Sequence, residues 1–160
     1  MSCVIRIEGV DLKEQFTQRE VNQIFNHIPS RTLLFWATEG LVGWQGENQD
    51  GRGRHRLYSI GDLYRLSVVE ELTSLGVPLE AVKWIVNLEK FDMGRVLAIA
   101  KMKHGREGMH WDTSAFLPEF VDPVKGASSP LERWGGAPSC ILLYLPEIAK
   151  RVRELVEQSA

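Results

Sequence analysis

The chain has 160 residues, of which 44% are hydrophobic and 25% are charged, a composition typical of a soluble globular protein with one domain or two small ones. The net charge of −2 predicts no overall attraction to nucleic acid or to anionic membranes, and no apolar run is long enough for a transmembrane helix. Cys3 and Cys140 form neither a disulfide framework nor a metal-binding spacing, and the lack of a signal-peptide pattern predicts a cytoplasmic protein.

The first segment, residues 1–15, is predicted to be a strand or an arm. Its apolar stretch, residues 3–10, is interrupted by Arg6 and Glu8. This stretch is a candidate partner for a second predicted strand at residues 140–145, in the same chain or in a partner chain.

Residues 16–40 have the pattern of two short helices joined by a turn. Thr17 and Glu20 have the spacing of a capping box, in which each side chain satisfies a free backbone N–H group at the start of a helix. A second helix is predicted to begin near Ser30 and to end at Gly40. Its inward-facing residues are expected to be Leu33, Trp36 and Ala37.

Residues 41–58 are rich in glycine and polar residues and are predicted to form two short strands and a loop, which is a β-wing. Ser59 is expected to cap a third helix that ends at Gly76, and Pro78 is expected to open a fourth. The order of helix, turn, helix, wing, helix and helix predicts a winged helix-turn-helix domain over residues 16–90. The predicted fold class is therefore mainly α with small β elements, followed by a small α+β region.

The same residues resemble a known family. The recurring pattern of the MerR family of bacterial transcription regulators is a Leu-Arg-Tyr-Tyr run and Gly-Leu, then a wing ending in an arginine and Tyr-Ser, then a helix closed by Leu-Gly. The residues that occupy these places are Leu33, Leu34, Phe35, Trp36, Gly40, Leu41, Arg56, Tyr58, Ser59, Leu75, Gly76 and Leu79. The resemblance covers roughly residues 16–88 and implies a DNA-binding domain of a transcription regulator.

The chain departs from the family pattern on the second helix. Leu34 stands where the family usually has arginine, and Phe35 and Trp36 stand in the places of two tyrosines. One guanidinium group and two hydroxyl groups suited to phosphate contact are thus missing. Either DNA is held differently here or the chain is a distant member of the family.

A row of arginines marks the wing. Residues 51–58 carry Arg52, Arg54 and Arg56 at every second position and no acidic residue. Residues two apart on a strand share a face, so this row and Tyr58 are predicted to lie on one side of the wing. Guanidinium groups in a row can follow a DNA backbone with bidentate phosphate contacts.

The second helix is predicted to enter the major groove, as the recognition helix of a helix-turn-helix does. Arg31 is the candidate for a guanine edge, and Thr32 for a thymine methyl group or a phosphate. Trp36 either donates its indole N–H to a phosphate or packs inside the domain. Thr17 and Arg19 are candidates for backbone contacts at the start of the first helix.

Residues 91–160 are predicted to be a dimerisation or effector region. A buried helix is expected from Met93 to about Gly105, and a loop over residues 121–139. A final helix is expected to start at Pro146. Its apolar stripe of Val152, Leu155 and Val156 either forms a homodimer interface or packs on its own domain.

Two groups of residues in this second half are candidate sensor sites. His104, His110 and Asp112 have only a loose metal-ligand spacing, so neither a metal nor a cofactor is predicted. The aromatic residues could line a pocket for an unknown small-molecule effector, although a small core is the favoured interpretation. They are Trp111, Phe116, Phe120 and Trp134.

The leading hypothesis is a sequence-specific DNA-binding transcription regulator that acts as a homodimer on double-stranded DNA. One alternative is an architectural DNA-binding protein similar to a phage excisionase. Another is a MerR-like module that binds a protein instead of DNA. An enzyme is not predicted, because the sequence has no recognisable catalytic motif.

Overall fold

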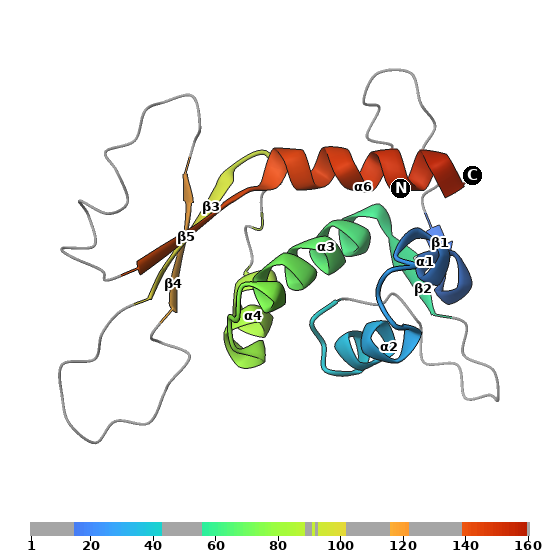
Figure 1. Cartoon of the computed structure of the whole chain (residues 1–160), viewed down its shortest axis with the longest axis horizontal. Helices are drawn as coiled ribbons and strands as arrows, with labels where there is room; N and C mark the ends of the chain where they lie inside the picture. Colours follow the sequence, from blue (N-terminus) through green and yellow to red (C-terminus); the bar gives the residue numbers. More distant parts are fainter. Residues whose placement is uncertain are drawn as a thin grey trace, which may run out of the picture.

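The computed structural model of the chain describes residues 15–42, 56–88, 91, 93–101, 116–121 and 139–159. Within these ranges helices predominate and the strands are short (Figure 1). The helices gather at one end of the molecule, a small sheet stands at the other end, and the last helix runs from the sheet back along the helical part.

The first helix, α1 (Gln18–Ile24), begins with the predicted capping box. The backbone N–H of Thr17 donates to Glu20 Oε2 at 2.8 Å, and the backbone N–H of Glu20 donates to Thr17 Oγ1 at 3.4 Å. Val21 and Ile24 are buried along its inner face, and Phe25 follows as a buried C-cap. The predicted start of this helix is confirmed.

The second helix, α2 (Ser30–Thr38), begins after a turn at Pro29, whose carbonyl accepts from the N–H of Thr32 at 2.8 Å. The helix stops where Gly40 adopts a φ of 72°, a left-handed conformation that costs glycine little. The N–H of Leu41 then donates to the carbonyl of Trp36 at 3.0 Å. The stop that the sequence predicted at Gly40 is confirmed.

Two short strands join the starts of two helices. β1 (Gln15–Thr17) pairs antiparallel with β2 (Leu57–Ser59), and Phe16 lies opposite Tyr58. Each strand leads directly into a helix, α1 in one case and α3 in the other. The strand expected at the end of the wing is thus present. Its described partner is β1, a pairing that the sequence did not predict.

The third helix, α3 (Ile60–Ser74), also begins with a capping box. Ser59 donates its backbone N–H to Asp62 Oδ2 at 2.8 Å, and its Oγ accepts from the backbone N–H of Asp62 at 3.2 Å. Gly76, with a φ of 76°, ends the helix, and α4 (Leu79–Val86) starts after Pro78. The predicted starts of α3 and α4 are confirmed, and both helices bury an apolar face.

The prediction of a helix from Met93 to Gly105 is wrong. Residues Val96–Lys101 form a strand, β3, which lies between β4 (Phe116–Val121) and β5 (Ser139–Tyr144) and pairs antiparallel with both. A short run such as residues 96–100, which are all apolar, suits a buried central strand as well as a buried helix, so periodicity does not separate the two. The strand expected at residues 140–145 is confirmed as β5.

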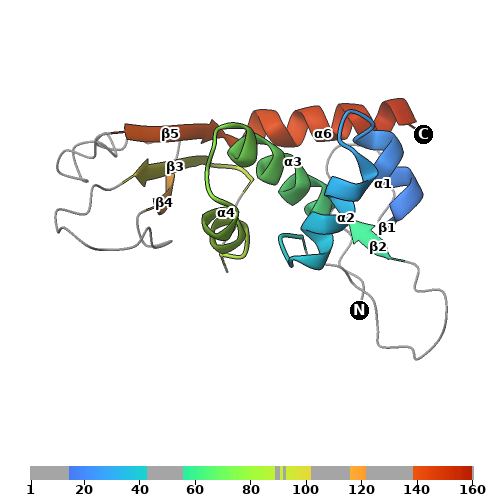
Figure 2. The same cartoon turned by 60° about the horizontal axis from the view of Figure 1, so that its bottom comes forward.

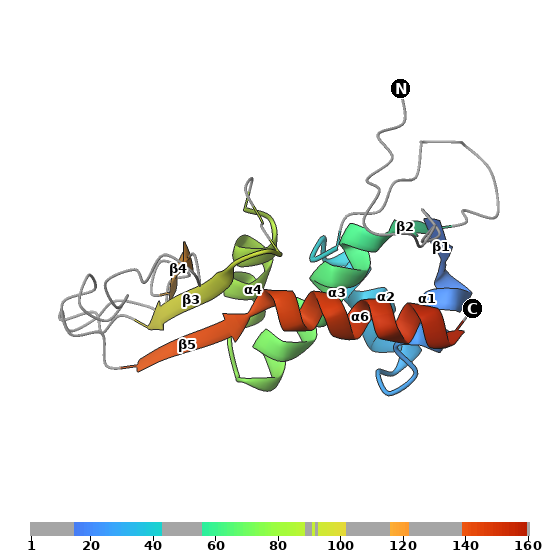
Figure 3. The ribbon, with the colours of Figure 1, turned by 90° about the horizontal axis from the view of Figure 1, so that it is seen from above.

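The final helix, α6 (Leu145–Ser159), continues directly from β5 and lies along α3 and α1 (Figure 3). Its buried residues are Leu145, Ile148, Ala149, Val152 and Val156. The predicted helix is confirmed, and its apolar stripe packs on its own chain. This arrangement favours the second of the two roles that the sequence left open for the stripe.

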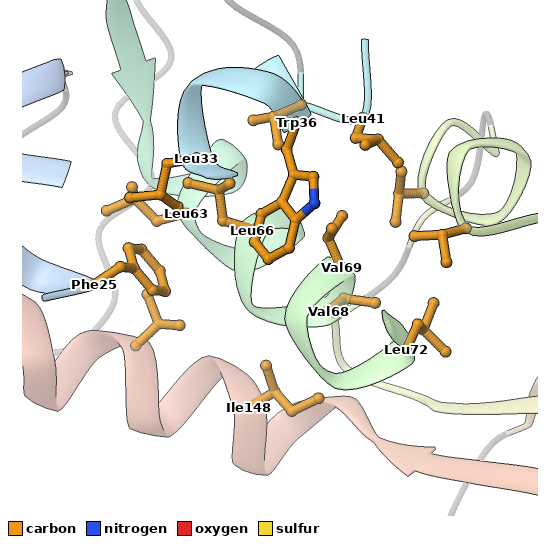
Figure 4. Packing of buried hydrophobic residues seen from close by; sticks show 14 of the residues in the cluster. Phe25, Leu33, Trp36, Leu41, Leu63, Leu66, Val68, Val69, Leu72 and Ile148 are labelled. Carbon is orange, nitrogen blue, oxygen red and sulfur yellow. The ribbon is translucent and has the colours of Figure 1, made fainter. Parts of the chain in front are cut away.

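One hydrophobic core joins the helices in three layers. α6 lies on one side of α3, and α2 lies on the other side (Figure 2). Figure 4 shows the leucines and valines of α3 between Ile148 of α6 and Leu33 and Trp36 of α2. Because α6 and α2 occupy opposite sides of α3, the outer face of α2 points away from the rest of the core.

Candidate nucleic-acid interface

The two faces of α2 differ sharply in burial. Leu33, Trp36 and Ala37 are buried against α3 and its neighbours. The outer face has the i, i+3, i+4, i+7 spacing that places residues on one side of a helix. It consists of Arg31, Leu34, Phe35 and Thr38, all of which are exposed. The exposed fractions of Leu34 and Phe35 are 45% and 46%, which is unusual for two adjacent large apolar side chains.

The polar groups of this outer face are few. Within the described residues, Arg31 makes no hydrogen bond or ion pair, so its guanidinium is open to a ligand. The hydroxyl of Thr38 donates back to the helix, to the carbonyls of Leu34 at 2.9 Å and of Phe35 at 2.8 Å. The face therefore presents one cation near the start of the helix and apolar carbon one turn later.

Two predicted contacts on α2 have less access to a ligand. The Trp36 side chain is only 7% exposed and packs beside Leu66 and Val69 of α3 (Figure 4). The packing role that the sequence allowed for Trp36 therefore describes this structure, because a buried indole cannot reach a phosphate. Thr32 is half-buried at the side of the helix.

At the start of α1, Arg19 is exposed and its side chain points away from the core. The hydroxyl of Thr17 lies 2.9 Å from Glu20 Oε2, so it already takes part in the capping box. A contact between Thr17 and DNA would compete with this cap, whereas a contact from Arg19 would not.

The end of the predicted wing is packed rather than exposed. Tyr58 is 1% exposed, and its hydroxyl donates to Gln18 Oε1 at 2.5 Å. Burial raises the pKa of Tyr58 above its usual value of 10.0, the positive charge of Arg56 lowers it, and the charge of Asp62 raises it further. Tyr58 interacts with Arg56, but its ring lies in the core opposite Phe16 and has almost no surface left for contact with DNA.

The arginines of the row fall into two groups. Arg52 and Arg54 lie outside the described residues. Arg56 is half-buried, and its Nη1 is inaccessible and has no hydrogen-bond partner among the described residues. Because that nitrogen is closed to a ligand, Arg56 can offer only the rest of its guanidinium to a phosphate.

The order of the helices agrees with a comparison of the sequence against known protein families. The family model described as MerR HTH family regulatory protein matches residues 16–89. We refer to residues 16–89, which match this family model, as the MerR-type domain. No curated protein matches the chain.

The MerR-type domain carries its departures from the family pattern on the outer face of α2. Leu34 and Phe35 take the places of an arginine and a tyrosine, and both are exposed. The third replacement, Trp36, belongs to the buried face. The sequence pointed to these three positions, but only the structure separates the two that face outward from the one that does not.

The region after the MerR-type domain differs from a long dimerisation helix. Residues 96–101 form β3, and the chain returns to the domain through β5 and α6. One ion pair accompanies this return, with Arg151 Nη2 lying 2.7 Å from Glu71 Oε1 of α3. The helical surface that the sequence offered for a homodimer is therefore used inside the chain.

Other sequence-predicted sites lie largely beyond the described residues. His104, His110, Asp112, Trp111 and Trp134 are all in undescribed segments, and Phe116 and Phe120 lie in β4, where only the backbone is described. Among the described residues no group of three or more His, Cys, Asp or Glu side chains could hold a metal ion. The helices of the described ranges include none that is long and apolar enough to cross a membrane.

Proposed function

We propose that the chain binds double-stranded DNA and regulates transcription, with α2 in the major groove and the arginines of residues 51–56 on the phosphate backbone. The observation that carries this proposal is the open outer face of α2 within a MerR-type domain. The face has a free guanidinium at Arg31, and α6 packs on the opposite side of α3. Nothing in the described core needs to move for α2 to enter a groove.

Phosphate contact is assigned to Arg52, Arg54 and Arg19. Phosphates carry most of the affinity of proteins for DNA, and they require cations that are free to approach the backbone. Arg19 is exposed, and Arg52 and Arg54 belong to a segment with no acidic residue. Arg56 is a weaker candidate because part of its guanidinium is buried.

A homodimer is part of the proposal, since two-fold pairing is the common way for small helix-turn-helix domains to reach operator specificity. The apolar stripe of α6 is not the interface, because it is covered by α3 and α1. The described surface that best suits pairing is β5, where Leu142 is 62% exposed and Tyr144 is also exposed. Exposed apolar residues on a strand favour association.

The second candidate function is binding of a protein partner by the same domain. It is favoured by one observation, the exposure of Leu34 and Phe35 where phosphate-binding groups stand in the family pattern. Adjacent exposed apolar side chains on a helix also suit a hydrophobic groove on another protein.

The two candidates are separated by binding of the full chain to a random-sequence DNA duplex. The Arg52→Ala/Arg54→Ala variant should bind more weakly, and the dependence of its affinity on salt should be shallower by roughly one unit of slope for each lost contact. The matched control is Lys150→Ala/Arg153→Ala, which removes the same charge from α6. An equal loss in both variants would point to net charge alone, and no DNA binding by the parent chain would favour the protein-binding module.

A further inference from the structure

The outer face of α2 has a chemical character that limits which DNA features it can recognise. Leu34 and Phe35 are exposed and contain no side-chain hydrogen-bonding atom. The hydroxyl of Thr38 is engaged by the carbonyls of Leu34 and Phe35, so its hydrogen is turned toward the helix. Past its first turn, this face therefore has no side-chain donor free for a base, and only the lone pairs of Thr38 Oγ1 could accept a hydrogen bond from one.

The major groove offers one apolar group to such a face. Guanine, cytosine and adenine present acceptors and donors there, whereas thymine adds a C5-methyl group that contacts apolar side chains such as phenylalanine. A leucine or phenylalanine placed against a polar base edge would desolvate that edge without replacing its hydrogen bonds, which is unfavourable.

We propose that Leu34 and Phe35 contact the C5-methyl groups of thymine, so that the protein prefers thymine at the base pairs beneath α2. The inference rests on the proposed DNA-binding function and assigns the base chemistry that this surface recognises. Arg31 supplies the polar part of the contact, because its free guanidinium suits the O6 and N7 acceptors of guanine.

The spacing along α2 limits how these contacts are arranged. Arg31 precedes Leu34 by three residues and Phe35 by four, which is about 4.5–6 Å along a helix that rises about 1.5 Å per residue. Successive bases of a strand are about 3.4 Å apart. A helix aligned with the groove would thus place the guanine and the thymine within about two base pairs of each other.

The test removes the methyl group alone. Duplexes are first selected from a random library by the full-length chain, and each thymine of a selected duplex is then replaced by deoxyuridine, which keeps the hydrogen-bonding groups. At one or two positions, the loss of a methyl group should weaken binding by roughly three- to fivefold, the change expected for one buried carbon. This measurement uses the parent protein, so it does not depend on the folding of any variant.

Two variants assign the effect to α2. In Leu34→Ala/Phe35→Ala, the difference between thymine and uracil duplexes should disappear, and both should bind with the affinity that the parent chain has for uracil duplexes or less. Leu75→Ala, at an exposed leucine after α3 that lies outside both α2 and the proposed dimer surface, should keep the full difference.

The outcomes separate this inference from the proposed function. If thymine and uracil duplexes bind equally well while binding still depends on salt, the DNA-binding function stands and the methyl contact is wrong. A thymine preference that survives in Leu34→Ala/Phe35→Ala would place the methyl contact elsewhere and overturn the inference. A parent chain that selects no DNA would overturn both proposals and leave Leu34 and Phe35 as a docking surface for a protein.

Discussion

Arg151 of α6 and Glu71 of α3 form an ion pair, with 2.7 Å between Nη2 and Oε1, across the joint between the last helix and the helix-turn-helix domain. The neighbouring Glu70 has its Oε1 2.6 Å from Nε2 of His27, which lies just after α1. The two consecutive carboxylates of α3 thus reach in two directions, toward α6 and toward the turn after α1. Because the ion pairs are partly exposed, we expect the apolar contacts beneath them to supply most of the stability.

The first prediction concerns α6. Ile148→Ala should lower the free energy of unfolding by about 2–4 kcal/mol, because Ile148 is buried against α3 and its loss leaves a cavity. Glu154→Ala, at an exposed position of the same helix, should change it by less than about 0.5 kcal/mol. Urea unfolding followed by circular dichroism measures both. If Ile148→Ala were as mild as its control, α6 would not belong to the core of the domain.

The second prediction concerns the helix stop before the wing. Gly40→Ala should cost about 1–2 kcal/mol, because Gly40 has a φ of 72° and an L side chain is strained there. An added Cβ would lie 3.8 Å from Lys83 Cε, an ordinary contact, so crowding should add little. Gly76→Ala is the matched variant, with a φ of 76° and nothing within 4 Å of the added Cβ. Similar losses in thermal unfolding would confirm a conformational cause, and a much larger loss at Gly40 would contradict it.

The third prediction concerns alkaline pH. Burial raises the pKa of Tyr58 above 10.0, so above this pH the unfolded chain loses a proton that the folded chain keeps. The contribution to stability is therefore complete below pH 10 and is lost as the pH rises through the folded-state pKa. Burial raises the pKa of Tyr64 as well, so part of the decline should come from Tyr64.

Tyr58→Phe should flatten this decline above pH 10. At neutral pH the variant should be less stable by about 1 kcal/mol, because Gln18 loses the hydroxyl that donates to it. Unfolding free energies measured between pH 8 and pH 11 give both effects. A decline that is equally steep in Tyr58→Phe would assign the alkaline loss to other groups.

The fourth prediction concerns assembly. The full chain should sediment as a homodimer at concentrations well above those needed to bind DNA. Leu142→Lys should weaken the dimer, because a charge on the exposed face of β5 opposes association. Leu75→Lys, at an exposed leucine after α3, is the control and should not. A monomeric parent chain would remove the homodimer from the account.

Local signals predicted the helical part well. The capping boxes at Thr17 and Ser59, and the glycine stops at Gly40 and Gly76, depend only on residues a few positions apart, and all are present. Strand pairing could not be predicted from such local signals. β1 and β2 lie about 40 residues apart, and β3 depends on partners in β4 and β5 that no local pattern reveals.

Only part of the candidate site could be predicted, because local spacing decides some of its residues and long-range pairing decides others. Helical spacing alone indicated that Arg31 faces outward and Leu33 inward, and the structure agrees. The alternation of the arginine row did not reveal that Tyr58 is buried, because its position is set by pairing with Phe16 across β1 and β2. Sequence reasoning noted Leu34 and Phe35 only as missing phosphate contacts, whereas their exposure makes them a surface of their own.

The central claim is that the chain binds DNA through α2 and nearby arginines. The most direct measurement is the affinity of the full chain for a random-sequence duplex across salt concentrations from about 50 to 200 mM. The account predicts that the logarithm of the association constant falls linearly with the logarithm of salt concentration. The slope should be about −3 for one protomer with three phosphate contacts and about −5 for the proposed homodimer, at about −0.9 for each contact. A chain that does not bind at 50 mM salt, or that binds with a slope near zero, would contradict the claim.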